Sequence, residues 1–221
     1  MNTNTLKILA AIFMLIDHIG VIFFPRVLIF RQIGRLAYPI FAYMIAEGCK
    51  YTRNKLKYFG LIFALGVVCQ LVYFVVDHSL YMCILITFSC SILEIYLLQT
   101  CKSLMKTKPI LSIIIILSSL YLLYELNQMF VIDYGFWGMM VPVFVSLGDL
   151  FDMNKYGKIG LLAVGLLFLA NAYGGIQYLS LLSCIFFIFY NGKKGKLNLK
   201  YFFYIFYPLH LVILYALDMF I

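Results

Sequence analysis

The fold is decided by a stretch near the amino terminus that reads LKILAAIFMLIDHIGVIFF from Leu6 to Phe24. Apolar side chains fill nearly all of it, and only Lys7, Asp17 and His18 can carry a charge. About 20 predominantly apolar residues are enough for a helix to cross the hydrocarbon core of a bilayer. We expect a retained first membrane span here, because Asp17 and His18 interrupt the apolar run that a cleaved signal peptide would need.

The same apolar character extends along the whole chain of 221 residues, of which 65% are hydrophobic and 12% are charged. Soluble domains carry about 25% charged residues, so lipid must cover most of this chain. Nine apolar segments can be drawn, at 6–24, 33–49, 58–76, 82–98, 109–130, 136–150, 159–171, 176–190 and 201–220. The sequence therefore predicts an all-α, polytopic integral membrane bundle of about 8–9 transmembrane helices, in a single domain over residues 1–221.

The formal net charge of +8 comes from basic residues in the short loops between apolar segments. Every second loop is basic, at 50–57, 102–108, 155–158 and 193–200, whereas the loops that follow the third, fifth and seventh segments lack Lys and Arg. Basic loops stay in the cytoplasm. We therefore expect a multi-pass protein of the cell inner or plasma membrane with a cytoplasmic amino terminus. Its partners then include membrane lipid, and nucleic acid is not expected.

One loop breaks this alternation, because Arg26 and Arg31 precede the second segment and Arg35 lies just inside it. By the alternation these arginines belong on the outer side. They could pair with lipid phosphates or cap helix ends. They could instead bind an anionic substrate or cofactor, since a guanidinium presents a fork of donors to phosphate or carboxylate.

Asp17 and His18 are the main candidates for chemistry in the first segment. Each ionisable residue at a helix centre costs about 2.5–3.5 kcal/mol on the insertion scale. They form either a hydrated interfacial pair or a buried general base with a carboxylate nearby. Consecutive helical residues point about 100° apart, so in a regular helix Asp17 needs another partner, such as an arginine, unless the helix loosens near Gly20. Lys7 falls on the same helical face as His18.

Further intramembrane polar residues leave alternative functions open. His210 is a second histidine within an apolar segment, with a structural, positioning or binding role. Asp17, His18, Glu94 and Glu125 could form the proton relay of a small transporter. The chain could also be an assembly factor without catalysis. His, Cys and acidic residues show no metal-ligand spacing and no soluble-enzyme motif is present, so we expect no metal.

Several short motifs, in conserved order over nearly the whole chain, resemble the TraX family. They are Asp17-His18-Ile-Gly, Arg35-Leu-Ala-Tyr-Pro39-Ile-Phe41, Ala46-Glu47-Gly48, Tyr51-Thr52-Arg53-Asn54, Asp133-Tyr134-Gly135 and Tyr207-Pro208-Leu-His210-Leu. The member that gives the family its name acetylates the amino terminus of pilin. TraX proteins are in turn similar to a wider group of transmembrane acyltransferases.

This resemblance implies a membrane acetyltransferase. It would move an acetyl group from cytoplasmic acetyl-CoA, the co-substrate, to an amine or hydroxyl of a protein, peptide, sugar or lipid acceptor. In this reading His18 is the general base, and Asp17 orients or supports its imidazole.

The resemblance also implies binding residues for the acyl-CoA or the acceptor. Arg35, with Arg31 or Arg26, would contact them through guanidinium groups. Lys7 stands where OafA-type O-acyltransferases have an arginine before the catalytic histidine. The remaining binding candidates within the shared motifs are Asp133, Tyr207 and His210.

Overall fold

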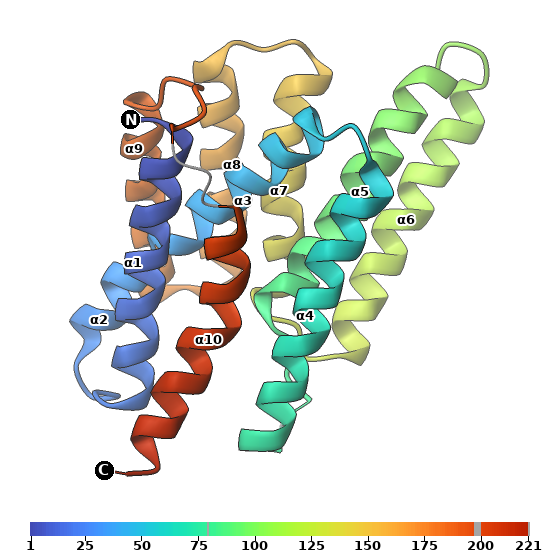
Figure 1. Cartoon of the computed structure of the whole chain (residues 1–221). Helices are drawn as coiled ribbons and strands as arrows, with labels where there is room; N and C mark the ends of the chain where they lie inside the picture. The colour runs from blue at the N-terminus through green and yellow to red at the C-terminus, as the bar shows by residue number, and fades with distance from the viewer. Residues whose placement is uncertain (79, 197–199, 221) are drawn as a thin grey trace. The chain divides into compact units, whose positions relative to one another are not determined.

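The computed structural model describes residues 1–78, 80–196 and 200–220, and these residues are largely helical (Figure 1). The β pairing recorded in that part of the chain is one isolated bridge between Met82 and Ile132. The chain divides into two compact units. The first unit contains Met1–Ala42 and Leu166–Ile221, and the second contains Tyr43–Gly165.

Five helices in the described residues are long and apolar enough to cross a membrane. They are α1 (Thr3–Ile22), α4 (Lys55–Asp77), α5 (Ile84–Leu104), α6 (Pro109–Met129) and α8 (Lys155–Tyr173). Shorter apolar helical stretches lie in α7 (Gly135–Leu150), in the 3-10 helix η1 (Gly175–Ser183) with α9 (Cys184–Ile188), and in α10 (Lys200–Asp218). The prediction of an all-α, multi-pass membrane protein is confirmed.

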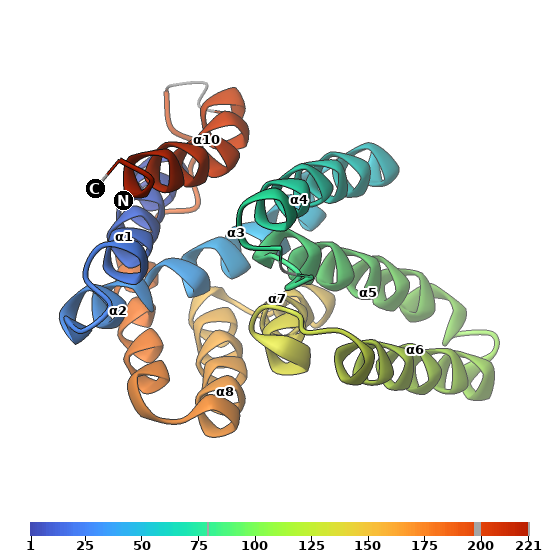
Figure 2. The ribbon, with the colours of Figure 1, turned by 90° about the horizontal axis from the view of Figure 1, so that it is seen from below.

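In the first unit, α10 packs along α1, and both helices run in the same direction (Figures 1 and 2). The side chain of Asn2 caps α1 by accepting a hydrogen bond from the backbone N–H of Thr5. The end of α9 returns to the start of α1, where the Met1 amino group donates to the Phe189 carbonyl at 2.6 Å. The segment formed by η1 and α9 therefore runs antiparallel to α1.

The second predicted span is two helices instead of one continuous helix. The arginine-containing loop forms α2 (Leu28–Gly34), and α3 (Ala37–Tyr51) follows after a turn. Pro39 explains where α3 begins, because proline lacks the N–H group that has no helical partner in a first turn anyway. This break puts Arg35 in the turn, and not inside the span where the sequence placed it.

The eighth predicted span also departs from a regular α-helix. Gly174 and Gly175 have positive φ angles of 67° and 51° and make a tight turn, η1 begins at Gly175, and α9 follows it. A 3-10 helix rises about 2.0 Å per residue and an α-helix about 1.5 Å, so this segment reaches about 25 Å instead of about 21 Å. The tighter winding lets a short segment approach the thickness of the bilayer core.

In the second unit, α5 lies among α4, α6 and α7 and contacts all three (Figure 2). It therefore carries many buried side chains, including Thr87, Ser91 and Glu94. By contrast α6 exposes large apolar side chains such as Ile110, Leu117 and Leu122 over most of its length. These exposed side chains are suited to contact with lipid.

In the second unit the basic loops share one end, and in the first unit the one basic loop lies beside the amino terminus. In the second unit, Lys50 and Lys158 both place their Nζ atoms 2.7 Å from Oδ1 of Asp149. In the first unit, the backbone N–H of Thr3 donates to the carbonyl of Lys193. This agrees with the alternation of basic loops, part of which (197–199) lies outside the described residues. Which end faces the cytoplasm stays a prediction.

Candidate functional site

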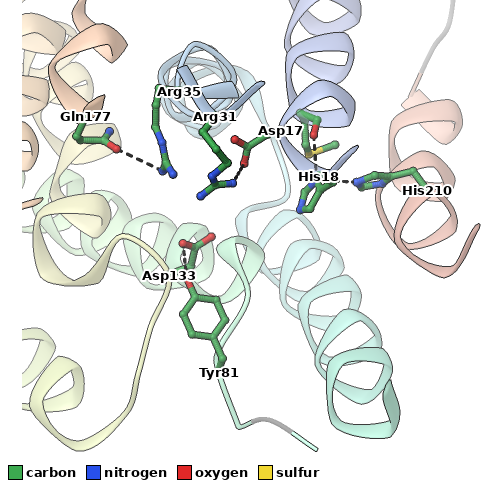
Figure 3. Close-up of polar contacts among 9 residues, drawn as sticks. Asp17, His18, Arg31, Arg35, Tyr81, Asp133, Gln177 and His210 are labelled. Atoms are coloured by element: carbon green, nitrogen blue, oxygen red, sulfur yellow. Dashed lines mark hydrogen bonds and ion pairs between the residues drawn. The ribbon is translucent and has the colours of Figure 1, made fainter. Parts of the chain in front are cut away.

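The first unit brings His18 of α1 against His210 of α10 (Figure 3). Their ring centroids are 4.9 Å apart and the rings meet edge to face at 63°. Nε2 of His210 lies 3.2 Å from Nδ1 of His18. His210 is buried, with only 4% of its surface exposed, whereas His18 is partly exposed. Two segments 192 residues apart in the sequence thus form one histidine pair.

Backbone carbonyls determine which nitrogens of this pair carry protons. Nδ1 of His18 lies 2.9 Å from the Met14 carbonyl, and Nδ1 of His210 lies 2.8 Å from the Phe206 carbonyl. A carbonyl oxygen only accepts, so each Nδ1 must be the donor, and Nε2 of a neutral His210 accepts from Nδ1 of His18. In this assignment the single Nδ1 proton of His18 is shared between the Met14 carbonyl and Nε2 of His210, and Nδ1–H of His210 donates to the Phe206 carbonyl. The assignment leaves Nε2 of His18 with a lone pair, the form a general base requires.

Aromatic side chains hold the His210 ring in place. Phe206 stacks on it at a centroid distance of 5.0 Å and an interplanar angle of 8°. Tyr207, one of the predicted binding residues, packs against the ring at 5.7 Å and 71°. Both residues come from α10 itself, so this helix positions its own histidine.

Asp17 pairs with Arg31, as the sequence geometry suggested, and α1 stays helical past Gly20 to Ile22. Nη1 of Arg31 donates to Oδ2 of Asp17 at 2.6 Å. The recorded partners of the His18 ring are Met14 and His210, so the carboxylate of Asp17 supports Arg31 instead of the imidazole. Its second oxygen, Oδ1, is buried and has no hydrogen-bond partner among the described residues.

Arg35 extends this arrangement toward η1, where its Nη1 lies 3.4 Å from Oε1 of Gln177. Arg31 and Arg35 stand four residues apart, a spacing that puts them on one side of α2. A row of polar side chains results (Figure 3), hereafter the polar chain, which consists of Gln177, Arg35, Arg31, Asp17, His18 and His210. Gln177 was not among the residues predicted from the sequence, because no motif includes it. Arg26 lies in the exposed loop before α2, and no partner is recorded for it among the described residues.

Lys7 and Asp133 are not members of the polar chain as defined above. Lys7 precedes His18 by three turns of α1, about 16 Å along the axis. Asp133 belongs to the second unit, where Oη of Tyr81 donates to its Oδ1 at 2.5 Å and the hydroxyl of Thr87 donates to its carbonyl at 2.7 Å. Burial and the Asp133 carboxylate raise the pKa of Tyr81, so this phenol stays protonated as a donor.

The polar chain combines a base with cationic donors. Nε2 of His18 can remove a proton, and the guanidinium groups of Arg31 and Arg35 can hold an anionic group or a developing oxyanion. No cluster of three or more His, Cys, Asp or Glu side chains that could hold a metal occurs in the part of the chain that the structure describes. The expected absence of a metal stays a prediction.

Comparisons with known proteins cover this whole arrangement. A family model described as "TraX protein" matches residues 2–218. A relative from Dichelobacter nodosus, described as "Probable fimbrial assembly protein FimC, serogroup H1", is 28% identical over 243 residues, which cover 98% of this chain and 95% of the relative. No solved structure matches the chain. The region matched by the family model includes every residue of the polar chain.

Proposed function

The chain belongs to the TraX family, and on that premise we propose that it is a membrane acetyltransferase that acts in fimbrial or pilin assembly. Acetyl-CoA is the donor, and an amine or hydroxyl of the fimbrial subunit is the acceptor. The assembly role is supported by the name of the Dichelobacter nodosus relative, a probable fimbrial assembly protein. The transfer chemistry rests on the histidine pair.

The observation that carries this proposal is that Nδ1 of His18 contacts Met14 and His210, while Nε2 has no partner among the described residues. Nε2 removes the proton of the acceptor amine or hydroxyl as the acceptor attacks the thioester carbonyl. The tetrahedral intermediate collapses, the carbon–sulfur bond breaks, and the proton on Nε2 passes to the departing thiolate. The Met14 carbonyl stabilises the transient imidazolium through Nδ1–H.

Asp17 and the arginines have a different role from the one that the resemblance implied. The carboxylate of Asp17 fixes the guanidinium of Arg31 at 2.6 Å, so it positions a cation near His18 and does not orient the imidazole. Arg31 and Arg35 then supply donors for the thioester oxyanion or for an anionic group of a substrate. Arg26, Lys7 and Asp133 are not needed for this step.

The transporter alternative receives less support, because its four ionisable residues have local partners. Asp17 pairs with Arg31, and Glu94 accepts a hydrogen bond from Ser119 at 3.1 Å. Glu125 interacts with Tyr121 of the same helix.

The test uses the purified protein in nanodiscs with acetyl-CoA and a synthetic peptide that carries the amino-terminal segment of the host's fimbrial subunit. Wild type should add one acetyl group to the peptide, detected by mass spectrometry. His18→Gln should reduce the rate by about 10²–10⁴-fold, the usual contribution of a general base. It should still bind acetyl-CoA and unfold at the wild-type temperature.

His78→Asn is the matched control, because His78 lies in an exposed loop after α4 and its left-handed backbone suits asparagine. This variant should retain full activity. A wild-type protein that binds no acyl-CoA at millimolar concentration would rule out the enzyme function. Equal activities of wild type and His18→Gln would show that His18 is not the general base.

A further inference from the structure

One face of η1 carries buried polar groups that the mechanism above does not use. Gln177, Ser180 and Ser183, here called the η1 row, are 4%, 0% and 0% exposed. Nε2 of Gln177 and the hydroxyl oxygens of both serines have no hydrogen-bond partner among the described residues. Burying such groups unpaired is unfavourable. The three donors therefore need a partner that the described residues do not supply.

Other buried serines of this protein show what the η1 row lacks. The hydroxyls of Ser89, Ser91, Ser112 and Ser146 each donate to a carbonyl three or four residues earlier in their own helix. This back-bonding is the ordinary way for a membrane helix to satisfy a serine. Ser180 and Ser183 do not use it, so their hydroxyls are unpaired among the described residues, and a ligand reaches them when the side chains that cover them move aside.

The winding of η1 aligns the row. A 3-10 helix has three residues per turn, so side chains three apart lie directly above one another, about 6 Å apart. The other faces of this segment are apolar and exposed, as at Leu182 and Ile185. The polar face thus points into the protein and the apolar faces point outward, which is the orientation of a binding track within a membrane.

The ends of this track differ in chemistry. At the Gln177 end stands Arg35, and through it the polar chain leads to His18. Toward the other end, Tyr190 meets the hydroxyl of Thr3 at 3.0 Å, beside the exposed basic loop that contains Lys193, Lys194 and Lys196. From Gln177 to Tyr190 the segment rises about 22 Å. A ligand along it would join the basic end of the unit to the histidine pair.

We propose that the η1 row binds the amide-bearing pantetheine arm of acyl-CoA. This inference rests on the proposed function and names the place of the donor in it. The arm has two amides whose carbonyls lie about 5 Å apart when extended, close to the spacing of successive donors in the row. Its phosphates are suited to the basic loop, and its thioester end reaches toward Arg35 and His18. The hydrogen-bonded row then replaces water around the amides within the bilayer.

The experiment compares ligands that share parts of the donor. The full chain in nanodiscs is titrated calorimetrically with coenzyme A, pantetheine and 3′,5′-ADP. The double variant Ser180→Ala/Ser183→Ala should raise the Kd of coenzyme A and pantetheine at least about tenfold, as expected for two hydrogen bonds lost in a closed site. The Kd of 3′,5′-ADP should stay unchanged, because this nucleotide lacks the arm.

Ser112→Ala is the matched control, since Ser112 is equally buried but bonds the Lys108 carbonyl. It should leave all three Kd values unchanged. The ligand-free double variant should melt no lower than wild type, because it loses only unpaired hydroxyls. If the double variant cannot be purified folded, the two single variants are measured, and each should weaken pantetheine binding about threefold.

The outcomes separate the two proposals. A wild type that binds no coenzyme A overturns both. A wild type that binds it and transfers acetyl groups, with pantetheine binding unchanged in the serine variants, overturns the η1 row alone. If the serine variants raise the KM for the acceptor peptide but bind coenzyme A as tightly as wild type does, the row binds the acceptor. That result also overturns the present proposal.

Discussion

Gly34 allows the Asp17–Arg31 ion pair to form because it has no side chain. A Cβ atom built at this position would lie 2.0 Å from Oδ1 and 2.4 Å from Cγ of Asp17. Gly34→Ala should therefore displace the carboxylate or α2, and lower the unfolding free energy by about 1–3 kcal/mol. Thermal or denaturant unfolding of the purified protein measures this loss, and acetyl transfer should fall with it.

Gly60→Ala is the control for that substitution. Gly60 lies in α4, and a Cβ there meets nothing within 4 Å. Alanine in a helix is favoured over glycine by about 0.5–1 kcal/mol, so this variant should be as stable as wild type or slightly more so. Gly34→Ala with wild-type stability and activity would show that the ion pair does not need this close approach.

His210 is predicted to act through His18 instead of touching the substrate. His210→Leu removes the acceptor of the His18 Nδ1 proton, so His18 can turn or change tautomer, and kcat should fall about 10–100-fold. The KM for acetyl-CoA should not change. His210→Gln places an amide oxygen in reach of the same proton and should restore part of kcat. A change in KM with unaltered kcat would instead indicate a binding role.

For single residues, the sequence predicted which side chains are functional candidates better than it predicted which residues they contact. The charges of Asp17, His18 and Arg35 stood out because charge is costly in a bilayer. The need of Asp17 for an arginine followed from helix geometry. The pairing of His18 with His210 did not follow, because a sequence without internal repeats does not say which helices are neighbours. Gln177 was missed because an amide within an apolar segment carries no charge signal.

Among the elements, α3, α7 and α8 are joined by one buried cation. Nζ of Lys158 lies 2.8 Å from Glu47 and 2.7 Å from Asp149, and its side chain is 8% exposed. Lys158→Met would leave two carboxylates without this partner and should cost about 3–5 kcal/mol of stability. Lys50→Met removes a 40% exposed partner of Asp149 and should cost at most about 1 kcal/mol.

Denaturant unfolding of both variants in the same detergent checks this contrast. Adding Glu47→Gln to Lys158→Met should recover part of the loss, since one unpaired carboxylate is then neutral. Equal stabilities of Lys158→Met and Lys50→Met would mean that the buried network contributes no more than a surface ion pair.

The sequence predicted the helical segments well but missed changes of winding within them. Hydropathy reports burial in lipid, and an α-helix and a 3-10 helix of the same composition give the same signal. For this reason η1 was expected to be α-helical. Likewise, the apolar run that ends in α3 concealed the turn at Arg35, although Pro39 was a local signal for a first turn.

For the whole molecule, the placement of the basic loops leads to a prediction about orientation. The background is a variant whose six cysteines are replaced by serine. Lys194→Cys and Arg26→Cys are then introduced separately, at positions near opposite ends of α1. A membrane-impermeant maleimide should label Arg26→Cys in intact cells and Lys194→Cys only in inverted vesicles. Labelling of both cysteines from one side would contradict a membrane-spanning α1.

The 3-10 winding of η1 also leads to a prediction about how this segment varies among members of the family. Each residue turns a 3-10 helix by a third of a circle, so deleting one residue between Gln177 and Ser180 would turn Ser180 and Ser183 onto a different face from Gln177. Substitutions leave this phase intact, whereas insertions and deletions destroy it. Relatives should therefore differ freely in residue type on the outer faces of η1 and keep its length between Gln177 and Ser183 unchanged.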